Sequence, residues 1–177
     1  MTGRIAKLYG LILSLMVCSP MTAEVKGGEY LKYVHEIVGV CSKEMRDHFG
    51  LVCVGSGGSM PHDVEKMRIV FESIRKVSIE EARSLEIKVI ERLREVINAH
   101  QYIRPFLREY PFPHERIEVQ IAFINKRGES YIDGSVALTF QTQNRLFYFS
   151  RDRETDDLVD LYDEPYEEAY RKVYKIQ

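Results

Sequence analysis

The glycine- and serine-rich stretch from Gly55 to Ser59 comes closest to a chemical motif. It consists of Gly55, Ser56, Gly57, Gly58 and Ser59 and follows a short apolar run, as a phosphate-binding loop does. A dinucleotide fingerprint requires a helix directly after its glycines, and a nucleotide P-loop requires a Gly-Lys-Ser/Thr ending; the sequence has neither. The stretch therefore predicts a flexible turn or a backbone binding site for a partner. The sequence indicates no cofactor.

Ser56 and His62 are the residues near this stretch that an enzyme could use. Ser56 lies between two glycines, but the strand-to-helix turn of a hydrolase nucleophile is not indicated around it. His62 is followed by Asp63, yet the five histidines show no metal-ligand spacing. We expect a surface turn here and no metal site. The alternative is a small hydrolase or transferase that uses the glycine stretch with Ser56 or His62.

A second candidate site lies in an aromatic and proline-rich segment, residues 102–113. It holds four aromatic residues and three prolines, which predicts a stiff segment attached to the core. Arg104 and Arg108 are four residues apart, so they can share a face that holds a carboxylate or a phosphate. Pairing with the protein's own carboxylates is the interpretation we favour. Together with Tyr110 and with Gly55, Ser56, Gly57 and Gly58, these arginines complete the set of candidate binding residues.

The cysteines divide into Cys18 near the N-terminus and a pair in the body of the chain, Cys41 and Cys53. In an oxidising compartment this pair can form a disulfide. Closing a loop of this length stabilises a fold by about 3 kcal/mol in the loop-entropy model. The alternative is two buried thiols, one on a helix and one on a strand. The sequence leaves both alternatives open.

Residues 1–23 have the pattern of a secretory signal peptide. Two basic residues precede an apolar run over residues 11–17, and mostly small residues lead to Ala23. The sequence therefore predicts cleavage after Ala23 and a periplasmic or secreted protein. The apolar run is too short to cross a bilayer alone, and we expect no transmembrane span in the mature chain. Because the residues before Cys18 also resemble a lipoprotein signal, a lipid anchor at Cys18 is the alternative.

Cleavage after the signal peptide leaves 23 basic and 27 acidic residues, a net charge of −4. Residues 24–150 are balanced, and residues 151–177 carry the whole excess, with nine acids and five bases. No basic stripe is visible, which disfavours nucleic-acid binding. The acidic stretch lacks the glycine turn of a calcium loop. We therefore expect residues 151–177 to be a solvated tail with a short helix over 167–174.

The clearest structural signal is a long helix over residues 78–100. Ser78 and Glu81 form a capping box at its start, and apolar residues then recur on one side for about six turns. A one-sided stripe of this length predicts a helix that lies on a sheet. Glu86 falls inside the apolar arc. We expect its carboxylate to reach water or an arginine rather than to be buried with a raised pKa.

Around this helix the sequence predicts a single α+β domain over residues 24–150. A first helix is expected over 29–48. Short apolar runs and alternating apolar residues predict strands at 51–54, 66–74, 116–124, 130–141 and 145–150. Short connections favour antiparallel pairing. We therefore expect an antiparallel sheet of four to five strands with the long helix on one face.

Five short motifs within residues 50–125 form a combined pattern. They are Val54-Gly55-Ser56-Gly57-Gly58-Ser59-Met60, Glu81-Ala82-Arg83, Ile97-Asn98, Ile103-Arg104-Pro105-Phe106-Leu107 and Tyr110-Pro111-Phe112. The pattern resembles a group of small exported proteins of intracellular bacteria, although Ser59 departs from it. The resemblance implies export and contact with a host, and it implies no activity. We interpret the chain as an exported, non-enzymatic protein that binds an unidentified protein or envelope component through the glycine stretch and the aromatic segment.

Overall fold

The computed structural model describes residues 28–176. The predicted signal peptide, its cleavage after Ala23 and the alternative lipid anchor at Cys18 lie outside these residues and stay predictions. Within the described part of the chain, no helix is both long enough and apolar enough to cross a membrane.

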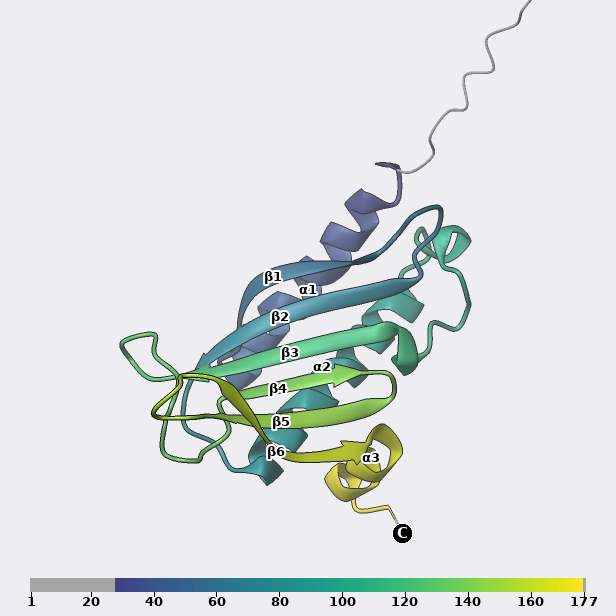
Figure 1. Ribbon diagram of the computed structural model, residues 1–177. Helices are drawn as coiled ribbons and strands as arrows, with labels where there is room; N and C mark the ends of the chain where they lie inside the picture. The colour runs from purple at the N-terminus through teal and green to yellow at the C-terminus, as the bar shows by residue number, and fades with distance from the viewer. Residues whose placement is uncertain (1–27, 177) are drawn as a thin grey trace, which may run out of the picture.

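Within residues 28–176, three helices and six strands make a two-layer α+β fold (Figure 1). In chain order they are α1 (Leu31–Phe49), β1 (Val52–Ser59), β2 (Lys66–Ile74), α2 (Ile79–Ala99), β3 (Ile117–Ile124), β4 (Leu138–Thr142), β5 (Arg145–Arg151), β6 (Leu158–Pro165) and α3 (Tyr166–Tyr174). Two short 3-10 turns, Arg104–Phe106 and His114–Arg116, lie between α2 and β3. The predicted α+β class is confirmed, and so is a long helix on one face of the sheet.

The six strands form one sheet in the order β1-β2-β3-β4-β5-β6. Neighbouring strands are antiparallel except β2 and β3, which are parallel. The predicted antiparallel sheet of four to five strands is therefore wrong in strand number and in one pairing. The parallel pair arises because α2 carries the chain from the end of β2 back to the start of β3. Such a crossover returns the next strand in the same direction.

Helix α2 begins, and helix α1 ends, where the sequence predicts. The Ser78 side chain accepts a hydrogen bond from the Glu81 amide, and the Glu81 carboxylate accepts one from the Ser78 amide. These two bonds complete the capping box of α2. Helix α1 ends at Gly50, whose left-handed backbone (φ 64°) allows the chain to turn out of the helix.

The hydrophobic core lies between the helices and one face of the sheet. Alternate strand residues such as Ile69, Phe71, Val119 and Ile121 are fully buried on this side, where α1 and α2 pack (Figure 1). The residues between them point to the opposite side of the sheet. No helix within residues 28–176 covers that side (Figure 1). We call it the open face.

The structure departs furthest from the sequence prediction in the C-terminal segment, which was expected to be a solvated tail. Residues Leu158–Pro165 form the edge strand β6, and only the helix that follows, α3, is close to the prediction. Glu164 of β6 is 1% exposed, so the segment is part of the folded unit. The strand predicted over 130–141 is also shorter than expected, because the regular strand begins only at Leu138.

Candidate functional site

The glycine-rich stretch is not a turn but the second half of strand β1, at one edge of the sheet. Residues 55–59 pair with residues 66–70 of β2 in antiparallel register, and a bulge at Val54 separates them from the start of the strand. On its other side β1 meets no strand within the described residues. The backbone donors and acceptors on that side are therefore free to pair with an added strand.

The two edge strands of the sheet differ in their protection against such pairing. Strand β6 contains Asp160, Asp163 and Glu164 and ends in Pro165, and charges and prolines are residues with which natural edges discourage pairing. Strand β1 has the sequence VCVGSGGS, with neither a charge nor a proline. Its bulge is a protective feature too, but it lies before residues 55–59. This five-residue segment is therefore the edge best suited to accept a strand.

The glycines of β1 differ in what the fold requires of them. The backbone at Gly58 has a φ of 152°, and a Cβ atom added there would lie 2.0 Å from the carbonyl oxygen of Lys66. The β1–β2 hairpin therefore needs glycine at this position. At Gly57 no described atom lies within 4 Å of an added Cβ, and at Gly55 the nearest is 3.8 Å away on Val70. Glycine in a strand often marks the close approach of another backbone.

Replacing Gly58 with alanine is expected to lower the free energy of unfolding by about 3 kcal/mol, because the new methyl group collides with backbone in an unfavourable conformation. Replacing Gly57 with alanine is the matched control and should change it by less than about 1 kcal/mol. Urea denaturation of both variants measures the difference. Equal stability of the two variants would contradict the register of the β1–β2 hairpin.

A hollow of about 260 Å³ lies beside these glycines, lined by Gly58, Ser59, Lys66, Arg68 and Glu118. Glu118 accepts hydrogen bonds from Arg68 Nη2 at 2.6 Å and from Lys66 Nζ at 3.3 Å. Burial alone would raise the pKa of Glu118, but the hydrogen bonds and positive charges of Arg68 and Lys66 outweigh burial and lower it. An ionised carboxylate thus holds two cations next to the β1 edge.

The aromatic and proline-rich segment lies at the glycine-bearing end of β1. Val64, in the turn after the strand, pairs with Leu107. The Tyr30 hydroxyl donates a hydrogen bond to the Met60 carbonyl at 2.7 Å, and the Tyr30 ring packs on Phe106 with centroids 5.9 Å apart. The two candidate binding regions are therefore neighbours, and Tyr30, the residue directly before α1, contacts both.

Arg104 and Arg108 do not combine into an anion site. Arg108 forms ion pairs with Asp63, at 3.0 Å, and with Glu65. Arg104 donates a hydrogen bond to a backbone carbonyl at the end of α2 and lies over the ring of Tyr110, 4.8 Å from its centroid. The protein's own groups occupy both guanidinium groups, which is the interpretation the sequence favours.

Ser56 and His62 are not arranged as a catalytic pair. Both are exposed, Ser56 on β1 and His62 in the turn that follows, and none of the described hydrogen bonds joins them. No group of three or more His, Cys, Asp or Glu residues within 28–176 is placed to hold a metal ion. The groups near the glycines are therefore backbone hydrogen-bonding groups and cations, which suit binding, and they do not include a nucleophile paired with a base.

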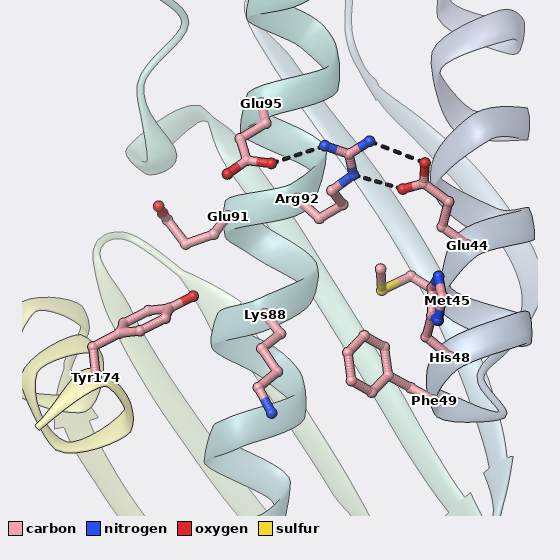
Figure 2. Close-up of a pocket in the computed structure, with 9 residues that line it drawn as sticks. All are labelled: Glu44, Met45, His48, Phe49, Lys88, Glu91, Arg92, Glu95 and Tyr174. Carbon is pink, nitrogen blue, oxygen red and sulfur yellow. Dashed lines mark hydrogen bonds and ion pairs between the residues drawn. The ribbon is translucent and has the colours of Figure 1, made fainter.

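A groove that the sequence does not indicate lies over α2, between α1 and α3 (Figure 2). It encloses about 400 Å³. Arg92 of α2 crosses it to Glu44 of α1 with two hydrogen bonds, at 2.5 and 2.9 Å, and also binds Glu95 at 2.8 Å. Lys88 lies 5.4 Å from the ring centroid of Phe49. Because these charges and rings are engaged with one another, the groove is better described as a helix-packing surface than as a ligand site.

Glu86 is fully buried beneath α2, so the expectation that its carboxylate reaches water or an arginine is wrong. The Thr139 hydroxyl donates a hydrogen bond to one carboxyl oxygen, and the other oxygen has no hydrogen-bond partner among the described residues. Burial is the dominant influence and raises the pKa of Glu86 to about 8, although the hydrogen bond from Thr139 and the nearby backbone of Gln141 act in the opposite direction. Glu86 is therefore mostly a neutral carboxylic acid at pH 7, inside the core and away from β1.

Cys41 and Cys53 are free thiols. Cys41 on α1 is fully buried, and burial raises the pKa of its thiol to about 12. Cys53 on β1 is half-buried, and its Sγ lies 3.5 Å from the carbonyl oxygen of Gly55. Of the two alternatives that the sequence leaves open, this arrangement corresponds to one thiol on a helix and one on a strand.

No protein-family model, curated protein or solved structure matches the chain. No relative therefore supplies a ligand or an activity. The features of the molecule that bear on function are the β1 edge, the cations beside it and the aromatic segment that supports it.

Proposed function

We propose that this protein is a non-enzymatic binding protein that captures an extended segment of a partner protein as a seventh strand, paired with residues 55–59 of β1. The observation that carries the proposal is the contrast between the two edges of the sheet. One edge carries three acids and a proline, whereas β1 carries no charge and no proline. Natural sheets protect their edges against unwanted pairing, so an edge left without these residues suits a binding function.

Strand addition also explains why the segment is rich in glycine and serine. In this mode of recognition, main-chain hydrogen bonds provide most of the affinity, and small residues let the partner backbone approach without side-chain clashes. The edge is held in place by its pairing with β2 and by the contacts of Met60 and Val64 with Tyr30 and the aromatic segment. A preformed edge loses little conformational entropy when it binds.

The proposal places this binding activity outside the cytoplasm. The N-terminal pattern supports export with a mature chain that starts at Glu24, periplasmic or secreted. The partner is then a protein or a protein component of the envelope, and not a nucleic acid. With a lipid anchor at Cys18, the alternative form of the N-terminus, the same edge would work at a membrane surface.

The proposal is tested by selecting linear peptides from a random display library on the immobilised mature protein. We expect selected peptides whose binding falls about tenfold when Ser56 is replaced by lysine, because a charge on an edge strand opposes strand pairing. Gly39→Lys is the matched control, since it adds the same charge at an exposed position on α1 where a Cβ has room. Failure to select any peptide, or equal binding to both variants, would contradict strand addition at β1.

A further inference from the structure

The open face next to β1 has a feature that bears on the partner's side chains. Gly55 and Gly57 lie opposite Val70 and Arg68 in the β1–β2 register. Because these glycines carry no side chains, no side chain of β1 stands between Arg68 or Val70 and the edge of the sheet, whereas Ser59 lies opposite Lys66. The side chains of Lys66 and Arg68 are 43% and 49% exposed, and they line the hollow beside the glycines.

The charges in this hollow are not balanced. Lys66 and Arg68 share one carboxylate, that of Glu118, which is 10% exposed and lies on β3, behind them as seen from the edge. The Thr142 hydroxyl, the other described hydrogen-bond partner of Glu118, is neutral. Two cations against one carboxylate leave an excess of one positive charge in the hollow, with both cations turned toward Glu118 in the free protein.

We propose that the partner segment carries an aspartate or a glutamate whose carboxylate binds Lys66 and Arg68 above Gly57. This inference rests on the strand addition proposed above and specifies what the added strand contains. A strand paired with β1 would lie two strand spacings, roughly 10 Å, from β2. When the Arg68 side chain turns from Glu118 toward the edge, it and an acidic side chain reaching toward it span about that distance, and Gly57 leaves their path open.

The alternation of side chains along a strand adds a second element to the expected sequence. Residues two apart point to the same face, and Val70 lies two residues from Arg68 on the open face, opposite Gly55. The partner residue two positions from the acid therefore lies near Val70, where a small or apolar side chain fits. In a partner strand antiparallel to β1, which passes Gly57 before Gly55, the recognised segment is expected to read acid, any residue, then a small or apolar residue.

The test compares acidic and neutral versions of peptides selected on the mature protein. Replacing the acid by its amide, Asp by Asn or Glu by Gln, is expected to weaken binding about tenfold at low salt, as for a charge-assisted contact. In the Arg68→Gln variant this difference should shrink strongly. Arg145→Gln is the control, because Arg145 also lies on the open face but on β5, paired with Asp163.

The possible outcomes separate the two proposals. Selected peptides that lose affinity in the Ser56→Lys variant but show no preference for an acid would overturn this inference and leave strand addition in place. An acid preference that is unchanged in Arg68→Gln would also overturn it. If no selected peptide binds through β1, strand addition fails and this inference fails with it.

Discussion

Replacing Glu164 with alanine is expected to lower the free energy of unfolding by about 3–5 kcal/mol, the usual cost of removing one partner from a buried ion pair. The Glu164 carboxylate accepts hydrogen bonds from Arg83 Nε at 2.6 Å, from the Tyr148 hydroxyl at 2.7 Å and from Lys172 Nζ at 2.8 Å. These partners belong to α2, β5 and α3. Without the carboxylate, the buried guanidinium group of Arg83 and the Tyr148 hydroxyl both lose their acceptor.

Asp163→Ala is the matched control, since it removes the neighbouring acid from the same strand. Asp163 is 48% exposed and pairs only with the exposed Arg145 among the described ion pairs, so its loss should cost less than about 1 kcal/mol. Chemical denaturation of both variants gives the comparison. If the Glu164 and Asp163 variants were equally stable, residues 151–176 would be the solvated tail that the sequence suggests, and β6 would not be part of the core.

Replacing Glu86 with glutamine is expected to stabilise the protein by several kcal/mol above pH 8 and to have little effect near pH 4. The pKa of Glu86 is raised from 4.5 to about 8 in the folded protein. The stability contribution linked to this pKa is thus fully present below about pH 4.5 and is lost as the pH rises to about 8. The loss is on the order of 1 kcal/mol per pH unit, because only the unfolded chain ionises the group in this range. Glutamine cannot ionise, so the variant should lack this slope.

The control for this prediction is Glu95→Gln on the same helix. Glu95 is 61% exposed and binds Arg92 at the surface, so its replacement should leave the slope unchanged. Unfolding free energies measured at several pH values between about 4 and 9 show the slope directly. A Glu86→Gln variant that keeps the pH dependence of the wild type, or that loses several kcal/mol at high pH, would show that Glu86 is ionised in the folded protein.

The sequence predicts those elements whose signal is local. The capping box at Ser78 and Glu81, the glycine stop after α1, and the alternation that defines β2 and β3 all act within a few residues, and all appear in the structure. The features that sequence reasoning missed depend on distant partners. The parallel pairing of β2 with β3 follows from the course of α2 and is not encoded in either strand.

The candidate site could be predicted only in part, for the same physical reason. Gly55, Gly57 and Gly58 have low strand propensity and form a strand because β2 provides a template for pairing. Glu86 lies on the apolar side of α2, but its burial depends on Thr139, 53 residues away in the chain. The Lys66–Arg68–Glu118 cluster joins two strands that only the fold places side by side. The alternation of side chains along β2 and β3 puts these three charged residues on one face of the sheet, and this alternation is the only sequence signal that could have indicated the cluster.

Backbone amide hydrogen exchange of the mature protein, free and bound to a selected peptide, tests strand addition most directly. In the free protein, we expect the outward-facing amides of residues 55–59 to exchange rapidly while those of β2 and β3 are protected. The peptide should slow exchange in residues 55–59 and leave α1 and α2 unchanged. Protection confined to the helices, no change in β1, or protection of β1 that grows with protein concentration without peptide would contradict the capture of a partner strand at this edge.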